Sequence, residues 1–473
     1  MNTPGTTTAE QYDVIVIGGG STGENVAGYA TQNGLSAVVV ESELVGGECS
    51  YWACMPSKAL LRPGEALAAA RRVPAAAGAV TGSVDVDATL RARDRFSSNW
   101  DDTGQQEWLE GEGIDLMRGH GRVTGERTVE VTTGDGERVT LTARKAVVLA
   151  TGTAAAVPPI EGLRESNPWD NRQVTTTKEI PARLLVLGGG VVGTEMAQAY
   201  RSLGAEEVVI VEMADRLLPA EEPFAGDELA AAFDEAGIRV LTGSKATRAH
   251  REAADGPVTL VLDDGSELVG DELLVAVGRK ARTDDIGLDT IGLRPGDYVE
   301  VDDQLRARGV AGDWLYAAGD VNGRALLTHQ GKYQARLVGD IIAGKDLAAW
   351  ADHTAVPRVT FTDPQVAAVG DTERQARERG IDVRTVSLDL GHTAGGALQG
   401  KGFGGTAQLV IDQRRRVIVG ATFVGPGVGE MLHAATIAIV GEVSMDTLWH
   451  AVPAFPTVSE VWLRLLEADR ELG

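Results

Sequence analysis

Two stretches of the chain repeat one order of apolar and small residues. Each begins with a short apolar run, passes through closely spaced glycines into a helix-length segment, and ends in a second apolar run that stops at a glutamate. The first stretch covers residues 12–41 and the second covers residues 183–212. This order predicts a β-strand, a helix and a second strand in each stretch. We therefore expect two Rossmann-like units in an α/β chain.

The glycines of both stretches follow the spacing G-x-G-x-x-G, and each stretch ends in an acid about twenty residues further on. They are Gly18, Gly20 and Gly23 with Glu41, and Gly188, Gly190 and Gly193 with Glu212. Glycine lets backbone amides approach a pyrophosphate at a helix N-terminus, and the acid accepts hydrogen bonds from ribose hydroxyls. A ligand-free turn would explain one copy. Two copies predict two dinucleotides, and FAD with NAD(P)H is the natural pair for electron transfer.

The end of the second stretch bears on which nicotinamide cofactor is used. Glu212 would repel the 2′-phosphate of NADPH, and Met213, Ala214 and Asp215 after it are not basic. We therefore expect NADH to be favoured. The alternative is that Glu212 only ends a strand and that Arg216 turns toward a 2′-phosphate.

The remaining length divides into two further parts. A strand is expected at residues 273–277 and another at residues 314–320, whereas strand-like and helical runs alternate from residue 351 onward. We therefore expect a separate α+β domain from residue 351 onward.

Composition excludes several classes of function. The chain has 44 basic and 68 acidic residues, a formal net charge of −24, which repels nucleic acids and anionic membrane surfaces. We find no apolar run of membrane-spanning length. The first eleven residues lack the apolar core of a signal peptide and are expected to form a disordered lead into the first strand. A cytoplasmic protein is expected.

Cys49 and Cys54 are the only cysteines. In a reducing compartment a close pair is more plausibly a redox or metal site than a structural disulfide, and two thiolates alone make a poor zinc site. Cα atoms five residues apart in an ideal helix are about 8–9 Å apart, whereas a disulfide needs less than roughly 7 Å. A bridging pair would therefore distort the first helical turn. Two inert, buried cysteines are the alternative.

Residues 46–61, around the two cysteines, resemble the redox-active motif of the class I pyridine nucleotide-disulfide oxidoreductases, the family of lipoamide dehydrogenase, glutathione reductase and mercuric reductase. The similarity covers almost the whole chain. It implies an FAD domain interrupted by an NAD domain, followed by a dimerisation domain. The implied bounds are 1–155 and 275–350 for the FAD domain, 156–274 for the NAD(P) domain and 351–473 for the dimerisation domain. It also implies a homodimer in which the partner's C-terminal segment completes each active site.

The resemblance also assigns roles. Cys54 would be the thiolate beside the flavin, and Cys49 the interchange thiol that meets a small-molecule substrate. Lys58 and Glu195 would form an ion pair by the flavin, where an unpaired buried lysine would be costly. Further residues implied in cofactor binding are Gly47, Thr151, Gly152, Gly278, Arg279, Gly319, Asp320, Leu327, Thr328 and His329.

The chain departs from the family at its C-terminal end. The family's disulfide reductases have a proton-transferring histidine directly before Pro-Thr, followed five residues later by an orienting glutamate. Glu460 is present, but Phe455 occupies the histidine position and cannot transfer a proton. His450 is about 16 Å from position 455 along an extended chain. We interpret it, like His329 and His433, as a structural or surface histidine.

The missing histidine shapes the functional expectation, because a positioned acid–base group is worth roughly 10²–10⁴ in rate. We expect a flavoenzyme that passes electrons through Cys49 and Cys54 to an unidentified substrate other than ordinary lipoamide or glutathione disulfide. One alternative is a quinone or diffusible-acceptor reductase that works directly from the flavin. The other is a redox-sensing flavoprotein with little turnover.

Overall fold

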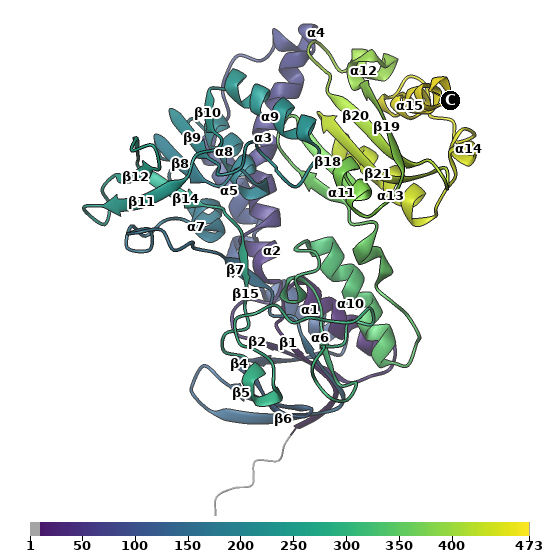
Figure 1. The fold of residues 1–473 in the computed structure, drawn as a ribbon. Helices are drawn as coiled ribbons and strands as arrows, with labels where there is room; N and C mark the ends of the chain where they lie inside the picture. Colours follow the sequence, from purple (N-terminus) through teal and green to yellow (C-terminus); the bar gives the residue numbers. More distant parts are fainter. Residues whose placement is uncertain (1–9, 473) are drawn as a thin grey trace, which may run out of the picture. The chain divides into compact units, whose positions relative to one another are not determined.

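The computed structural model describes residues 10–472, which fall into two compact units that we describe separately (Figure 1). The first unit contains the described residues up to Pro56, Asp94–Ala155 and Gly278–Asp352. The second contains Ser57–Arg93, Ala156–Val277 and the chain from His353 onward. No helix among the described residues is long and apolar enough to cross a membrane.

A seven-stranded sheet forms the centre of the first unit. Its order is β3-β2-β1-β6-β5-β4, with β16 also paired to β6. The pairs of β1 with β2 and β6, of β2 with β3 and of β16 with β6 are parallel, while β4, β5 and β6 form an antiparallel meander. The strands are β1 (Glu10–Ile17), β2 (Ala37–Glu41), β3 (Asp115–Arg118), β4 (His120–Gly125), β5 (Thr128–Thr132), β6 (Arg138–Leu149) and β16 (Leu315–Ala317).

The first strand begins earlier than the sequence suggested. Glu10 and Gln11 belong to β1, because the long strand β6 offers Leu141 and Thr142 as pairing partners. The expected disordered lead is therefore wrong for these two residues, and residues 1–9 lie outside the described part of the chain.

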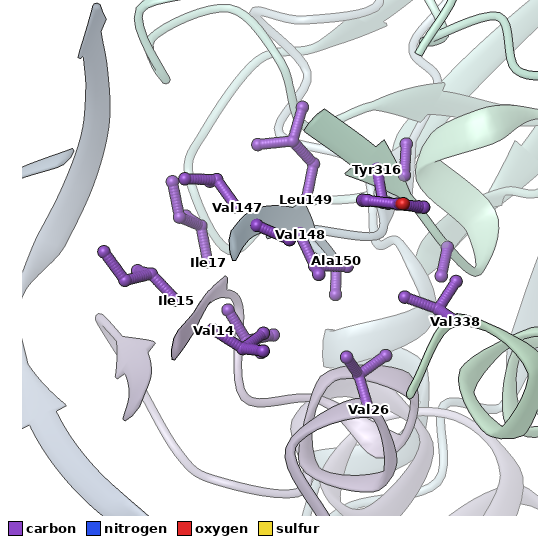
Figure 2. Packing of buried hydrophobic residues seen from close by; sticks show 14 of the residues in the cluster. Val14, Ile15, Ile17, Val26, Val147, Val148, Leu149, Ala150, Tyr316 and Val338 are labelled. Carbon is purple, nitrogen blue, oxygen red and sulfur yellow. The ribbon is translucent and has the colours of Figure 1, made fainter. Parts of the chain in front are cut away.

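Helices α1 (Ser21–Gln32) and α10 (Thr328–Ile342) pack closely against each other in the first unit. The close approach requires glycines on α10. A Cβ atom at Gly331 would lie 2.2 Å from Thr22 Oγ1, and one at Gly339 would lie 2.5 Å from the Tyr29 Cβ. Figure 2 shows side chains of β1, β6, β16 and both helices meeting in the core, among them Val14, Ile17, Val26, Val148, Tyr316 and Val338.

Shorter elements complete the first unit. β7 pairs antiparallel with β15 and forms a small separate sheet. The bounds are β7 (Thr153–Ala155), β15 (Arg279–Ala281), α2 (Gly47–Tyr51), α6 (Thr103–Gly111) and the 3-10 turns η1 (Ser98–Trp100), η2 (Leu288–Ile291) and η3 (Asp320–Asn322).

The second unit contains a parallel sheet of order β10-β9-β8-β14 and a three-stranded antiparallel sheet, β11-β12-β13. The strands are β8 (Arg183–Leu187), β9 (Glu207–Val211), β10 (Ile238–Leu241), β11 (Ala246–Arg251), β12 (Val258–Leu262), β13 (Glu267–Gly270) and β14 (Glu272–Val275). The helices are α3 (Cys54–Arg72), whose first three residues belong to the first unit, α4 (Pro74–Ala77), α5 (Val86–Phe96), whose last three residues belong to the first unit, α7 (Asn171–Thr176), α8 (Val191–Ser202) and α9 (Pro223–Glu235).

A five-stranded antiparallel sheet, β17-β18-β21-β20-β19, occupies the C-terminal part of the second unit. Its strands are β17 (Arg358–Thr360), β18 (Gln365–Gly370), β19 (Val383–Asp389), β20 (Thr406–Asp412) and β21 (Val417–Gly425). The helices here are α11 (Glu373–Glu378), α12 (Ala394–Leu398), α13 (Leu432–Val440), α14 (Met445–Leu448) and α15 (Val461–Glu471). Two Rossmann-like sheets with a C-terminal α+β part confirm the predicted α/β fold class.

Candidate functional site

The first glycine turn connects β1 to α1 and is built around Gly18 and Gly23. Gly18 has a φ of 102°, a conformation that side chains disfavour. A Cβ atom at Gly23 would lie 1.8 Å from the Gly18 carbonyl oxygen. Glu41, at the end of β2, accepts a 2.6 Å hydrogen bond from the Gly19 amide, and burial raises the pKa of its carboxyl. The turn thus leaves helix-terminal amides available to an anion.

The second turn connects β8 to α8 and repeats this geometry. Gly188 has a φ of 110°, and a Cβ atom at Gly193 would lie 1.9 Å from the Gly188 carbonyl oxygen. Glu212 accepts a 2.6 Å hydrogen bond from the Gly189 amide. In both copies, the acid therefore orders its own glycine loop. The sequence pattern predicted only a contact with a ribose.

Several features around the first turn fit a bound dinucleotide. The buried hydroxyl of Thr151 has no hydrogen-bond partner among the described residues. Gly20 and Gly47 approach each other so closely that a Cβ atom at Gly47 would lie 2.8 Å from the Gly20 Cα. Gly152 and Gly319 take φ values of 69° and 78°. An orphaned hydroxyl beside a cradle of glycines is what a phosphate- and hydroxyl-bearing ligand such as FAD requires.

A polar cluster forms where β7, β15 and η3 meet. Thr153 donates a 2.7 Å hydrogen bond to Asp320 Oδ2, and Arg279 Nε donates to the Thr153 hydroxyl and lies 3.6 Å from the same Oδ2. Burial raises the pKa of the Asp320 carboxyl, against the effect of its hydrogen bond from Thr153. Arg279, which the resemblance implies in cofactor binding, therefore lies beside Asp320, another residue of that set, and the adjacent Gly278 has a φ of 144°.

The two cysteines lie on different helices. α2 ends at Tyr51 and α3 begins at Cys54, so the expected single helical start is interrupted at Trp52 and Ala53. Both residues are thiols, and the Cys54 Sγ lies 3.4 Å from the Thr328 Oγ1 at the start of α10. A hydrogen bond with Cys54, burial and the charge of Cys54 raise the pKa of Cys49. Burial and the neighbouring Cys54 thus disfavour the thiolate form of Cys49.

Lys58 and Glu195 form an ion pair within the second unit, with 2.7 Å between Lys58 Nζ and Glu195 Oε2. Glu195 is buried on α8, and its other oxygen accepts a 2.9 Å hydrogen bond from the Phe361 amide. The Phe361 ring centroid lies 4.8 Å from Lys58 Nζ. The sequence analysis did not identify Phe361 as a partner of Glu195, because no local sequence pattern connects two residues so far apart in the chain.

Phe455 and Glu460 follow α14 in the C-terminal segment. The Phe455 ring is 76% exposed. Glu460 is buried and already engaged, since its carboxylate accepts hydrogen bonds from the Ala394 amide (3.1 Å) and from Arg464 (2.8 Å). The spacing of Glu460 and Arg464 by four residues on one helix edge was a readable signal that the sequence analysis did not use.

The three histidines considered from the sequence lie on different elements. His433 and His450 are exposed, on α13 and just after α14, and His329 lies in the first turn of α10. Among the described residues, no group of three or more His, Cys, Asp or Glu side chains is arranged to hold a metal ion.

Comparison with known families and proteins agrees with this architecture. Residues 12–335 match the model of the pyridine nucleotide-disulphide oxidoreductase family, and residues 356–465 match the dimerisation domain of that family. The chain is 30% identical over 470 residues to a mercuric reductase of Staphylococcus aureus, covering 98% of this chain and 83% of the relative. It is 32% identical over 460 residues to a dihydrolipoyl dehydrogenase of Chlorobaculum tepidum, covering 96% of each.

Solved structures show the same fold. The HOCl-induced flavoprotein disulfide reductase RclA from Escherichia coli has a TM-score of 0.83 at 22% identity, covering 96% of this chain and 99% of its own. LpdA from Mycobacterium tuberculosis has a TM-score of 0.84 at 23% identity, covering 98% and 100%. The chain belongs to the pyridine nucleotide-disulphide oxidoreductase family, whose members are enzymes that use FAD and NAD(P)H.

Proposed function

We propose that this enzyme passes electrons from a nicotinamide cofactor through FAD to Cys54 and Cys49, and from Cys49 to a small-molecule acceptor. The pairing of the two thiols carries the proposal, because Cys49 forms a hydrogen bond with Cys54 and the Cys54 sulfur lies 3.4 Å from the Thr328 hydroxyl. When bound, FAD accepts two electrons from the nicotinamide and passes them to the cysteine pair. The first glycine turn, Thr151 and Asp320 would hold it.

Several residues have distinct tasks in this proposal. Thr328 positions the Cys54 sulfur through its 3.4 Å contact. Cys49 attacks the acceptor, and Cys54 then attacks Cys49 to release the product. Lys58, held by Glu195, would present a fixed positive charge to a bound flavin.

Phe455 and Glu460 argue against an ordinary alkyl disulfide as the preferred substrate. Phe455 has no proton to give, and Glu460 is occupied by Arg464 and a backbone amide. We therefore assign an acceptor that does not depend on a histidine proton shuttle. The exposed Phe455 ring also favours a second candidate, in which a quinone or another diffusible acceptor takes electrons directly from the flavin.

We propose NADH as the favoured cofactor. Both carboxylate oxygens of Glu212 bond to backbone amides, which fixes its negative charge at the loop. Arg216 is directed to Asp215 and to the Pro219 carbonyl. Met213 is 71% exposed and supplies no charge. Met213→Arg should therefore raise the kcat/KM for NADPH relative to NADH by about tenfold, the effect of one ion pair worth ~1.4 kcal/mol.

We also propose a cytoplasmic homodimer in which the partner's C-terminal segment completes the active site. The match to the family's dimerisation domain supports the dimer. Val452 and Phe455 in the C-terminal segment are 86% and 76% exposed, as expected for side chains that a partner covers.

The decisive experiment compares the wild type with Cys49→Ser, Cys54→Ser and the surface control Ser83→Ala, using NADH with a disulfide probe, 5,5′-dithiobis(2-nitrobenzoate), and with a quinone, menadione. We expect both cysteine variants to lose disulfide reduction and the control to keep it. Unchanged disulfide reduction in Cys49→Ser would contradict the proposal. Brisk quinone reduction that survives in both cysteine variants, without any disulfide reduction in the wild type, would favour the second candidate. Negligible NADH consumption with every acceptor would favour redox sensing.

A further inference from the structure

The short turn η1 (Ser98–Trp100) is left-handed and contacts α2, the helix of the first unit that carries Cys49. Ser98, Asn99 and Trp100 have φ values of 49°, 50° and 56°. Left-handed conformations are costly for residues with a Cβ atom and normally occur at single positions. Three in succession persist only where the surrounding structure fixes them. The turn is therefore held in place by its contacts rather than by its own backbone preference.

The side chain of Trp100 binds the last residue of α2. Its indole Nε1 donates a 3.2 Å hydrogen bond to the carbonyl oxygen of Tyr51, where the helix ends. In a continuous α-helix this carbonyl would accept from the amide of residue 55. The indole gives the carbonyl a partner outside the helix, so α2 can end at Tyr51 and the chain can break at Trp52 and Ala53 before α3 begins. Trp100 thus favours the interruption between the two cysteines.

Asp102, two residues beyond the turn, holds the other end of α2. Its carboxylate accepts a 2.7 Å hydrogen bond from the amide of Val45, just ahead of the helix. Gln106, at 2.7 Å, and Arg118 donate to the same carboxylate and fix it. The buried Tyr51 hydroxyl donates a 2.9 Å hydrogen bond to the Val45 carbonyl, which ties the end of α2 back to its beginning. The turn and Asp102 therefore hold both ends of the helix that carries one redox cysteine.

The break between α2 and α3 decides how close the two thiols can come. In an unbroken helix, Cα atoms five residues apart are about 8–9 Å apart, whereas a disulfide needs less than roughly 7 Å. Here Cys49 and Cys54 are close enough to form a hydrogen bond. A helix that continued through Trp52 would carry the two sulfurs apart. The end of α2 at Tyr51 is therefore a condition for forming the disulfide.

Resting on the proposed function, we propose that Trp100 is a positioning residue for the redox pair: by ending α2 at Tyr51 it holds Cys49 within bonding reach of Cys54, and so sets the balance between dithiol and disulfide. When the pair is oxidised, one S–S bond forms, two electrons pass to the acceptor and two protons leave the thiols. Two electrons from the nicotinamide and two protons restore the thiols. Without the indole hydrogen bond, each thiol is at a lower effective concentration for the other, so the disulfide becomes easier to reduce.

The test measures the dithiol–disulfide equilibrium of the flavin-loaded enzyme in the wild type and in Trp100→Phe. Each protein is equilibrated without oxygen in mixtures of reduced and oxidised dithiothreitol, and its free thiols are trapped with N-ethylmaleimide and counted by mass spectrometry. Phenylalanine keeps an aromatic ring but cannot donate to the Tyr51 carbonyl. We expect the ratio of dithiol to disulfide to rise about tenfold, a shift of about 30 mV to a more positive potential. Trp350→Phe, at an exposed tryptophan of the same unit, is the matched control and should leave the ratio unchanged.

Substitutions at Asn99 test the left-handed turn itself. The Asn99 side chain is exposed, so a change there acts mainly on the backbone preference of the turn. Glycine adopts a positive φ without cost, whereas a β-branched residue resists it. Asn99→Gly should therefore keep the wild-type ratio of dithiol to disulfide, and Asn99→Val should raise the ratio as Trp100→Phe does. A turn that served only stability would lower the unfolding temperature of Asn99→Val and leave the ratio unchanged.

The outcomes separate this inference from the proposed function. If Trp100→Phe has the same ratio of dithiol to disulfide as the wild type, or if Asn99→Gly shifts the ratio as far as Asn99→Val does, the inference is overturned while the cysteine route stands. If the wild type forms no disulfide between Cys49 and Cys54 at any buffer ratio, the proposed function is overturned and the inference with it. Flavin content and thermal unfolding of each variant establish that the fold is intact, and the exposed position of Asn99 keeps the test available if Trp100→Phe does not fold.

Discussion

Lys58 Nζ lies 2.7 Å from Glu195 Oε2, and the second oxygen of the same carboxylate accepts a hydrogen bond from the Phe361 amide. The pair joins two helices, α3 and α8, that are far apart in the sequence. Glu195 is buried while Lys58 remains partly exposed, so the acid is fixed and the lysine head is presented to its surroundings. This arrangement suits a lysine whose charge acts on a ligand.

Glu195→Gln tests that assignment. Glutamine keeps an oxygen for the Phe361 amide but removes the charge that holds Lys58. Because a preorganised charge or donor contributes about 10²–10³ in rate, we expect flavin reduction by NADH to slow by at least ~10-fold in stopped-flow absorbance. Glu65→Gln, which alters a surface ion pair with Arg62 on α3, is the control. Equal flavin reduction in both variants would contradict the role of the pair.

The two glycine turns offer an internal comparison. An added Cβ would lie 1.8 Å from a carbonyl oxygen at Gly23 and 1.9 Å at Gly193. Such overpacking costs about 1–3 kcal/mol or more. We expect Gly23→Ala to lose FAD on gel filtration, and Gly193→Ala to keep FAD but bind NADH at least ~10-fold more weakly. Gly104→Ala, where a Cβ meets open space on α6, should change neither. Retention of FAD by Gly23→Ala would refute the assignment of the first turn.

FAD retention should depend on pH through Asp320. Burial raises the pKa of this carboxyl, so it takes up a proton at a higher pH than an exposed aspartate does. The protonated form accepts poorly from a ligand hydroxyl, so retention should fall as the pH is lowered and recover as it rises. Asp320→Asn should weaken retention by about tenfold, the worth of a charged hydrogen bond, and remove the pH dependence. Flavin released on ultrafiltration between pH 5 and 8 measures both effects, and an unaltered pH dependence in Asp320→Asn would count against Asp320.

Phe455→His should restore part of a lost proton shuttle. We expect turnover with lipoamide to rise by about tenfold, at the low end of general acid–base effects, because Glu460 is held by Arg464 and cannot orient the new imidazole freely. Adding Arg464→Met should raise the rate further. Val452→His places a histidine three residues earlier and is the control. A gain of the same size in Val452→His would show that position 455 has no special role.

The parts of this molecule that sequence predicted are those fixed by local chemistry. The glycine turns at Gly18 and Gly188 need backbone conformations and close approaches that few other residues allow, so their pattern is readable. The two-Rossmann fold follows from the alternation of buried strands and helices. The resemblance added the Lys58–Glu195 pair, which the structure does form.

The parts that sequence did not predict depend on tertiary packing. The sequence analysis expected a distorted helical turn only if Cys49 and Cys54 form a disulfide. It did not predict the break between α2 and α3, because the packing around α2 sets where that helix ends. Phe361 reaches Glu195 from another part of the fold.

The central claim is that electrons reach Cys54 and Cys49 before they reach the acceptor, and anaerobic titration with NADH tests it most directly. With one equivalent, we predict that the wild type keeps the absorbance of oxidised flavin and gains a long-wavelength thiolate–flavin band. Cys54→Ser should instead lose its flavin absorbance with that first equivalent. A wild type whose flavin is bleached by the first equivalent, without the long-wavelength band, would contradict the account.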